Sequence, residues 1–217
     1  LTGTLDIYNK QTDDLLLNQP LGPSSGFTSL LVNRGSLNNK GVELTLNGKL
    51  IDKNDFSIDI GGNIAFNKSE IQNLGGSPED IYINGILENR VFYRGQNIST
   101  GNYFKAPANI FVEGEEVGLF YGFETDGIYQ TEDDITVFGA QPGDVRIVDQ
   151  DGDGVITVAD RTIIGNPNPD FVYGGYLSMN YKRLSLSVQM NGVYGNEIAN
   201  GNLIQLGNAE GRSQNIL

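Results

Sequence analysis

Cysteine and histidine are both absent from this sequence of 217 residues. The absence of cysteine excludes disulfides and thiolate metal sites within this chain. The absence of histidine excludes a Ser-His-Asp triad, histidine-ligated zinc and a histidine pH switch. Basic residues are also scarce, with 14 Lys and Arg against 27 Asp and Glu and a net charge of -13. That sign disfavours nucleic acid and acidic substrates as ligands, and it suits cations or polar, uncharged molecules.

Long apolar runs are missing as well, because no stretch reaches the roughly 18 residues of a transmembrane helix. The chain opens on LTGTLDIYNK, which is typical of the middle of a strand and not of a signal peptide. We therefore expect the chain to be a piece of a longer protein. In place of helical stripes the sequence has 29 glycines, 10 tyrosines and 10 phenylalanines, and we expect β structure from this composition.

Four segments alternate strictly between apolar and polar residues, and they form two hairpins. Residues 41–50 are followed by residues 56–66, and residues 171–181 are followed by residues 184–194. A period of two residues is typical of strands with one buried face. The apolar phase consists of Val42, Leu44, Leu46 and Leu50; Phe56, Ile58, Ile60, Ile64 and Phe66; Phe171, Tyr173, Leu177, Met179 and Tyr181; and Leu184, Leu186, Val188, Met190 and Tyr194.

The length and chemistry of these segments predict that they cross a membrane as strands. Each segment has about 10 or 11 residues, which is what a tilted strand needs to span a bilayer, whereas strands of soluble sheets are about half as long. No charged residue falls on the apolar phase of the four segments. Aromatic residues gather towards the ends of that phase, as the interfacial girdles of an outer-membrane barrel require. They are Phe56, Phe66, Phe171, Tyr173, Tyr181 and Tyr194.

The links between the segments differ greatly in length. Residues 51–55 and the pair Lys182–Arg183 make short turns. The connections at the opposite ends cover residues 12–40, 69–115 and 124–170. Short turns on one side and long loops on the other are typical of outer-membrane barrels. The open alternative is a soluble β-sandwich or jelly roll, whose core-facing strands alternate in the same way.

The long connections hold most of the acidic residues and one stretch with strand character. Residues 115–130 alternate at Val117, Leu119 and Tyr121, and we interpret the part from 115 to 123 as a return of the chain into the barrel wall. A loop as long and as acidic as residues 124–170 needs a stabilising interaction to become ordered. The acidic side chains of this region are Glu113, Glu115, Glu116, Glu124, Asp126, Glu132, Asp133, Asp134 and Asp144.

The most specific chemical motif lies inside the last connection, where residues 149–160 read DQDGDGVITVAD. A twelve-residue EF-hand-type loop needs oxygen donors at positions 1, 3, 5, 7 and 12 and a glycine at position 6. Gly154 occupies the glycine position, and Thr157 occupies position 9, where a water is often the ligand. The donors are the carboxylates of Asp149, Asp151, Asp153 and Asp160 and the carbonyl of Val155.

We therefore predict a Ca2+ site in this loop, because four carboxylates so close together repel one another unless a cation or solvent screens them. The plainer interpretation is a solvated acidic turn, since Asp and Gly are ordinary turn residues. Position 12 is Asp160 and not the usual Glu, so bidentate capture is less assured and Mg2+ is a competing ion. The flanking residues lack helical periodicity, which argues against a calcium-sensing helix pair. The predicted role of the ion is therefore structural.

Several longer motifs, taken together, indicate a family. The most specific is GDVRIVDQDGDGVIT followed by DRTIIGNPNPDFVYGG, and GEEVGLFYGFETDGIYQ precedes it. Further upstream lie LDIYNKQTDDLLL, VNRGSLNNKGVELTLNGKL and NIAFNKSEIQNL. These stretches, which cover essentially the whole chain, resemble the late barrel region of the SusC/RagA-type TonB-dependent outer-membrane transporters.

That resemblance implies an all-β fold, in which residues 1–217 contribute antiparallel amphipathic hairpins with long extracellular loops to a large transmembrane β-barrel. It implies a location in the Gram-negative outer membrane, in contact with its lipid. The implied function is uptake of oligosaccharide or peptide, with a SusD-like lipoprotein at the extracellular face and energy from a TonB complex. The family's plug domain, TonB-contacting box and terminal strands are not recognised here, so we expect a partial barrel domain that does not transport alone.

Two other function classes fit parts of the sequence. The first is a soluble, calcium-stabilised all-β carbohydrate-binding or adhesion module, in which the tyrosines of residues 84–104 stack on sugar rings. Such a module must cover its apolar strand faces with a second sheet. The second is a hydrolase with paired carboxylates, but no acidic residue stands in a recognisable catalytic frame, so we do not expect an enzyme. Dockerin-like assembly needs a duplicated loop and a following helix, and the sequence offers one loop and no helix.

Overall fold

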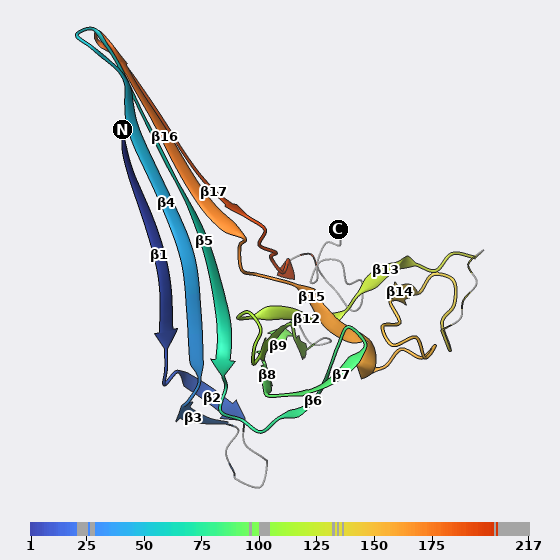
Figure 1. Ribbon diagram of the computed structural model, residues 1–217. Coiled ribbons are helices and arrows are strands. Elements are labelled where there is room, and N and C mark those ends of the chain that lie inside the picture. Colours follow the sequence, from blue (N-terminus) through green and yellow to red (C-terminus); the bar gives the residue numbers. More distant parts are fainter. Residues whose placement is uncertain are drawn as a thin grey trace. The chain divides into compact units, whose positions relative to one another are not determined.

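The computed structural model describes residues 1–20, 26, 29–95, 97–99, 105–131, 133, 135, 137–201 and 203 (Figure 1). Strands dominate these residues, and the 3-10 helix η2 (Val158–Asp160) is a single turn. Among the described residues no helix has the length and apolar character needed to cross a bilayer. The chain divides into two compact units. The first consists of residues 1–73 and 168–197, and the second consists of residues 74–167 and the segment from Ile198 on.

Five strands of the first unit form one antiparallel sheet, here called the wall sheet, in the order β1-β4-β5-β16-β17 (Figure 1). The hairpins β4–β5 and β16–β17 lie side by side, because β5 pairs with β16 although residues 74–170 separate them in the chain. The strands are β1 (Thr2–Thr12), β4 (Ser36–Lys53), β5 (Phe56–Asn73), β16 (Phe171–Tyr181) and β17 (Leu184–Tyr194). A short hairpin of β2 (Leu16–Pro20) and β3 (Ser29–Asn33) follows β1.

All four alternating segments are strands of the wall sheet, and two of them are longer than predicted. β16 and β17 have the predicted bounds, whereas β4 and β5 have 18 residues each. β4 continues through a bulge between Lys49 and Ile51 until Lys53 pairs with Phe56. The predicted turn over residues 51–55 therefore shrinks to Asn54 and Asp55. The predicted connections 12–40 and 69–115 likewise lose their strand-side residues to β4 and β5.

The two faces of the wall sheet differ in every strand. The row Leu5, Leu44, Ile64, Tyr173 and Gly192 crosses all five strands on one side, which we call the apolar face. Side chains on that face are largely exposed, as shown by Ile7 at 74%, Leu46 at 48% and Met190 at 62%. Because neighbouring rows point to opposite sides, the next row shows the polar face. It consists of Thr4, Thr45, Asn63, Gly174 and Asn191.

Aromatic rings group at both ends of the apolar face. At the turn end, the ring centroids of Phe56 and Tyr181 lie 6.1 Å apart. At the other end, Phe171 lies 5.6 Å from Phe66 and 5.0 Å from Tyr194, centroid to centroid. Tyr173 joins this second group, 6.0 Å from Phe171. The structure thus places the predicted aromatic girdle residues in two separate groups at opposite ends of the strands.

Three tyrosines of the wall sheet place ring atoms over a glycine on the neighbouring strand. Tyr8 covers Gly41, Tyr176 covers Gly61 and Tyr173 covers Gly192, and in each pair the two residues are direct cross-strand partners. A Cβ atom on any of these glycines would collide with the tyrosine ring. This arrangement gives a flexible glycine in a strand a packing partner, and it also fixes the ring.

The second unit has its own buried core around a sheet in the order β15-β12-β11-β8. The core consists of Ile81, Ile83, Ile110, Val112 and Leu119. The sheet strands are β8 (Phe92–Arg94), β11 (Asn109–Val112), β12 (Leu119–Phe123) and β15 (Arg161–Gly165). Three two-stranded pairs also belong to the described part of the unit: β6 (Glu79–Ile83) with β7 (Ile86–Arg90), β9 (Asn97–Ser99) with β10 (Lys105–Pro107), and β13 (Thr125–Ile128) with β14 (Val145–Ile147).

The predicted return of residues 115–123 into the barrel wall is wrong. The strand in this stretch, β12, pairs with β11 and β15, and among the residues that the structure describes it has no partner in the wall sheet. Its alternation has another cause, because Leu119 is buried in the core of the second unit and Tyr121 packs against that core. The same period of two residues therefore describes a strand with a protein core on one side.

Candidate functional site

The predicted metal-binding residues lie in one tight loop of the second unit, here called the acidic loop (residues 149–160). It begins after β14 and ends with η2, directly before β15. Gly152 and Gly154 have φ angles of 77° and 80°, in the left-handed region that glycine adopts without strain. The predicted sharp turn at Gly154 is therefore present, and no helix flanks the loop on either side among the described residues.

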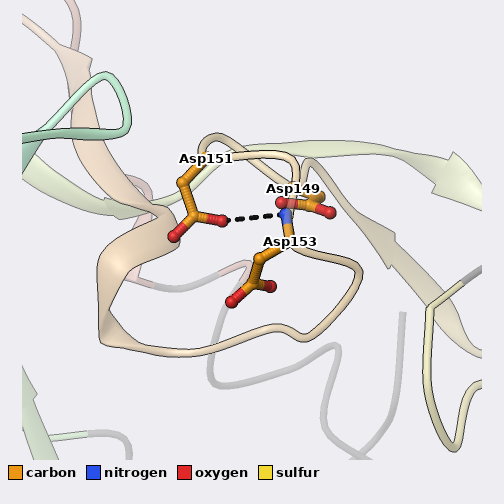
Figure 2. A group of neighbouring side chains, drawn as sticks. All are labelled: Asp149, Asp151 and Asp153. Carbon is orange, nitrogen blue, oxygen red and sulfur yellow. Dashed lines mark hydrogen bonds between the residues drawn. The ribbon is translucent and has the colours of Figure 1, made fainter.

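Three of the predicted carboxylates converge in this loop. Each of Asp149, Asp151 and Asp153 has an oxygen atom within 4.8 Å of those of the other two (Figure 2). Backbone N–H groups hold them in place. Asp149 accepts hydrogen bonds from Gly152 at 2.7 Å and Gly154 at 2.8 Å, and Asp151 accepts one from Asp153 at 3.2 Å. The loop backbone thus orients three oxygen donors of the type that Ca2+ and Mg2+ prefer.

The carboxylates of the acidic loop influence one another electrostatically. The hydrogen bond from the Gly154 N–H lowers the pKa of Asp149 below its usual value. Burial acts in the opposite direction, and further hydrogen bonds, among them the one from the Gly152 N–H, add to the lowering. Desolvation raises the pKa of Asp151, and the negative charges of Asp153, Asp160 and Asp149 add to that effect. A cation between these groups would relieve the repulsion that disfavours the charged form of Asp151.

Asp160 closes the loop instead of joining the three carboxylates. Its side chain is fully buried, and its two oxygens accept hydrogen bonds from the N–H groups of Gln150 at 2.9 Å and Thr157 at 2.7 Å. Thr157 in turn accepts a hydrogen bond from Ala159, so the pair forms a capping box at η2. Val155, the predicted carbonyl ligand, is 45% exposed, and its N–H donates to Asp153 at 2.7 Å.

The turn between β6 and β7 supports the acidic loop, a role that the sequence analysis missed. The N–H of Asn84 donates to the Thr162 hydroxyl at 3.1 Å, and that hydroxyl donates back to the Asn84 side chain. Gly85 has a φ of 72°, and a Cβ atom there would collide with the carbonyl of Gln150. An Asn-Gly pair between alternating apolar residues is a strong hairpin signal, so this turn could have been predicted.

Acidic residues outside the loop are engaged in structural contacts. Glu124 accepts a hydrogen bond from the Gln150 side chain at 3.0 Å, and its carbonyl accepts one from the N–H of Val148 at 3.0 Å. Arg146 pairs with Asp126 at 2.9 Å and lies 3.7 Å from Asp133. These contacts fix the segment that enters the acidic loop. Glu132 and Asp134, two further members of the predicted acidic set, lie outside the described residues.

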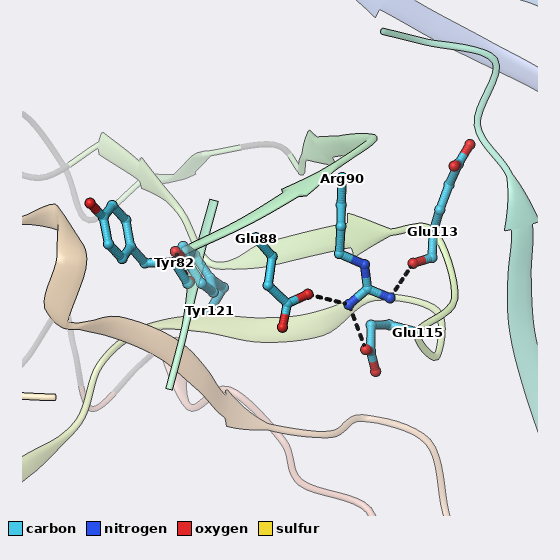
Figure 3. Close-up of polar contacts among 6 residues, drawn as sticks. All are labelled: Tyr82, Glu88, Arg90, Glu113, Glu115 and Tyr121. Atoms are coloured by element: carbon cyan, nitrogen blue, oxygen red, sulfur yellow. Dashed lines mark hydrogen bonds and ion pairs between the residues drawn. The ribbon is translucent and has the colours of Figure 1, made fainter. Parts of the chain in front are cut away.

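A second polar cluster surrounds Arg90 at the edge of the second unit (Figure 3). Its guanidinium lies 3.1 Å from Glu88 and 3.0 Å from Glu115, and it donates to the carbonyl of Glu113 at 2.5 Å. Nearby, the Tyr121 hydroxyl donates to the carbonyl of Tyr82 at 2.8 Å. Burial raises the pKa of Tyr121, against the opposing charges of Arg161 and Arg94. Because the guanidinium forms ion pairs with two carboxylates and also donates to a carbonyl, this cluster is suited to a structural role and not to acid–base chemistry.

Comparison with known proteins identifies receptors that are homologous to this chain. No protein-family model matches the chain. It is 34% identical over 215 residues to TonB-dependent receptor P3 of Formosa agariphila, an alignment that covers 97% of this chain and 20% of that protein. The chain is homologous to part of the TonB-dependent receptors. It is also 32% identical over 192 residues to TonB-dependent receptor SusC of Bacteroides thetaiotaomicron, covering 88% of this chain and 17% of SusC. The chain thus spans about a fifth of the length of its curated relatives.

Solved structures support the same fold. The RagAB peptide importer in its closed-closed state matches with a TM-score of 0.63 and 24% sequence identity, over 89% of this chain and 19% of the RagAB chain. The RagAB peptide transporter matches with a TM-score of 0.60. The predicted resemblance to SusC/RagA-type receptors, the all-β barrel fold and the outer-membrane location are therefore confirmed. The relatives are transporters and not enzymes. The Ca2+ site stays a prediction.

Proposed function

We propose that this chain forms part of the barrel wall of an outer-membrane nutrient importer. The observation that carries the proposal is the apolar face of the wall sheet, because uncharged rows cross all five strands between two aromatic groups. In a transmembrane barrel the outward face is apolar and flanked by aromatic girdles, and the inward face is polar. The row Thr4, Thr45, Asn63, Gly174 and Asn191 supplies such a polar face.

The exposure of the apolar face argues against a soluble binding module. A water-soluble sheet must bury its apolar face, because large exposed apolar patches are rare on soluble monomers. Leu184 is 74% exposed, Leu5 is 61% exposed and Val188 is 50% exposed. Hydrocarbon chains of a bilayer would cover these side chains without a second sheet. The membrane environment therefore accounts for the exposure, whereas the soluble alternative leaves it unexplained.

The proposed cargo is an oligosaccharide or a peptide, delivered with a SusD-like surface lipoprotein and driven by a TonB complex. Relatives named TonB-dependent receptor, SusC and the RagAB peptide importer support this assignment. The chain itself acts as wall and loops and carries no catalytic role. This is consistent with the Arg90 cluster, in which the carboxylates of Glu88 and Glu115 both form ion pairs with the guanidinium.

The experiment that tests the proposal uses the intact receptor that contains this chain. We expect the receptor to fractionate with the outer membrane and to migrate faster on gels before heating than after it. A strain that lacks the receptor should lose growth on the oligosaccharide or peptide mixture that supports the parent, and the receptor gene should restore it. Recovery of the receptor in the water-soluble fraction without detergent would contradict the proposal.

We also propose that the acidic loop binds Ca2+ in a structural role, with Mg2+ as the competing ion. The convergence of Asp149, Asp151 and Asp153 and the turn at Gly154 support this assignment. In this arrangement Asp160 holds the loop ends together through its two backbone hydrogen bonds. The ion would cancel part of the charge of the cluster and so order the connection between β12 and β16.

Limited proteolysis of the intact receptor tests the Ca2+ assignment. Ca2+ should protect residues 144–168 from cleavage, and a chelator should remove the protection. The double substitution Asp149→Ala with Asp153→Ala should abolish the effect of Ca2+. Asp52→Ala is the matched control, because Asp52 pairs with Lys49 in the wall sheet and takes no part in the second unit. If the chelator leaves cleavage of the parent protein unchanged, the loop is a solvated acidic turn.

A further inference from the structure

Two lysines stand directly opposite each other on the apolar side of the wall sheet, just beyond its uncharged part. Lys40 of β4 is the cross-strand partner of Lys68 of β5. No register shift separates this pair from the pair Val42 and Phe66, which is the next one on the same face. Two residues along a strand correspond to about 7 Å, so the lysines follow the aromatic group at a short distance.

Neither lysine has an acidic partner that offsets its charge. Both side chains are exposed, and neither takes part in an ion pair among the described residues. The nearest acidic residue on the same face is Glu70, one row further out opposite Asn38, and it accepts a hydrogen bond from the Gln72 side chain at 2.8 Å. Like charges directly opposite each other destabilise a sheet, so the pair calls for an anion from outside the chain.

The position of the pair along the strands indicates the source of that anion. Phe66, Phe171 and Tyr194 form the aromatic group at the long-connection end of the apolar face. Aromatic residues of membrane proteins sit at the level of the lipid headgroups. Lysines two residues further out extend their ammonium groups to the phosphates of those headgroups, while their methylene stems stay against the apolar surface. The third member of the row is Asn9, whose side-chain amide is a further donor.

We propose that Lys40 and Lys68 bind the phosphate of a lipid headgroup in the leaflet at the long-connection end of the barrel. This inference rests on the proposed function, because it requires the apolar face to contact lipid. Two ammonium groups from adjacent strands hold one phosphate between them, and Asn9 donates a hydrogen bond to it. The lipid then offsets the repulsion within the lysine pair and fixes the position of the barrel along the membrane normal.

Native mass spectrometry of the detergent-solubilised intact receptor tests the site, with bisphosphorylated lipid A as the probe. The double variant Lys40→Gln with Lys68→Gln should bind this lipid about thirtyfold more weakly, since each lysine near an anionic lipid surface contributes a factor of about five. Replacing both residues by arginine should retain most of the binding. Dephosphorylated lipid A should bind the parent receptor and the glutamine variant equally.

Lys10→Gln is the matched control. Lys10 pairs with Asn39, the neighbour of Lys40, so it lies at the same height on the polar face. The Lys10→Gln variant should bind the lipid as tightly as the parent receptor does. An equal loss in Lys10→Gln, or unchanged binding in the glutamine double variant, would overturn the inference. So would displacement of the lipid by inorganic phosphate at the same concentration, because the site would then hold a free anion.

Failure of this inference differs from failure of the proposed function. If the parent receptor fractionates with the outer membrane but prefers no phosphorylated lipid, only the lysine site is wrong. If the parent receptor is water-soluble without detergent, the apolar face does not contact lipid and both proposals fail. Heat-modified migration of each variant on gels shows that the variant has folded.

Discussion

Aliphatic side chains of the same types are buried in the second unit and exposed in the wall sheet. In the second unit Ile110 is 1% exposed and Val112 is 0% exposed. In the wall sheet Ile7 is 74% exposed and Val188 is 50% exposed. The second unit therefore has a core that excludes water, whereas the wall sheet presents an apolar surface and contributes no residue to the buried cluster found among the described residues. The difference shows that alternation alone does not say whether protein or lipid covers the apolar side of a strand.

Truncation in the core should have the largest effect. Ile110→Ala removes a buried side chain, and we expect the second unit to lose about 2 to 5 kcal/mol of unfolding free energy because a cavity remains. Leu46→Ala is the matched change in the wall sheet, where lipid fills the space and the expected loss is below about 1 kcal/mol. Denaturant titration followed by proteolysis of the second unit measures the first change, and unfolding from lipid vesicles measures the second. Equal losses would remove the distinction between the two regions.

A charge on the apolar face should have the next largest effect. Leu46 lies about midway between the two aromatic groups, and Leu46→Arg should cost about 2 to 4 kcal/mol, as expected for arginine at the bilayer midplane. Thr45→Arg places the same side chain on the polar face of the same strand and should cost far less. The urea midpoint for unfolding from phosphatidylcholine vesicles compares the two variants of the intact receptor. A reversed order would show that the faces have been assigned the wrong way round.

A substitution at the support of the acidic loop should have a smaller effect within the second unit. Gly85→Ala places a Cβ against the carbonyl of Gln150 in a left-handed conformation, and we expect a cost of about 1 to 2 kcal/mol. The consequence should be faster proteolysis of the acidic loop. Gly139→Ala is the matched control, because its φ of 82° gives the same backbone strain while nothing lies within 4 Å of the added Cβ. Equal cleavage rates in the two variants would exclude a specific contact between turn and loop.

Loss of a single hydrogen bond should have the smallest effect. Tyr121→Phe removes the donor to the Tyr82 carbonyl, and we expect a loss of about 1 kcal/mol. Burial raises the pKa of Tyr121, so the folded unit keeps the protonated form longer than the unfolded chain does. Stability contributed by this group is therefore complete below the unfolded pKa of about 10 and is lost as the pH rises from there through the higher folded pKa. Above pH ~10 the free energy of unfolding should change less with pH in the variant than in the parent. An equal pH dependence in the two proteins would show that Tyr121 is not its cause.

The wall sheet was largely predictable from the sequence, because each of its strands has one apolar side and one polar side. The bounds of β16 and β17 follow directly from the alternation that ends at Tyr181 and Tyr194. β4 and β5 were predicted too short. Beyond Lys40 and Lys68 the face that carries Val42 and Phe66 becomes polar, while Leu37 and Ile71 pair on the opposite face, so the alternation of the central part does not continue. Their extra length follows from ladder pairing between the two strands, which a single sequence does not display.

The second unit was mostly missed, since its strands have only three to five residues and leave little periodic signal. The Asn84–Gly85 turn was visible in the sequence, but the residues that it supports come together only through contacts between distant segments. For the acidic loop, the convergence of Asp149, Asp151 and Asp153 agrees with their spacing. Asp160 lies outside this group of three, and its oxygens accept hydrogen bonds that close the loop. Its role as a metal ligand stays a prediction.

The central claim is that the apolar face of the wall sheet contacts lipid, and fluorescence quenching tests it most directly. The chain has no cysteine, so single cysteines at positions 44 and 45 can carry a fluorophore in the intact receptor, provided the rest of that receptor is also cysteine-free. After reconstitution in phosphatidylcholine vesicles with a nitroxide-labelled lipid, we expect strong quenching for Leu44→Cys and little for Thr45→Cys. Equal quenching at the two positions, or stronger quenching at position 45, would contradict the account.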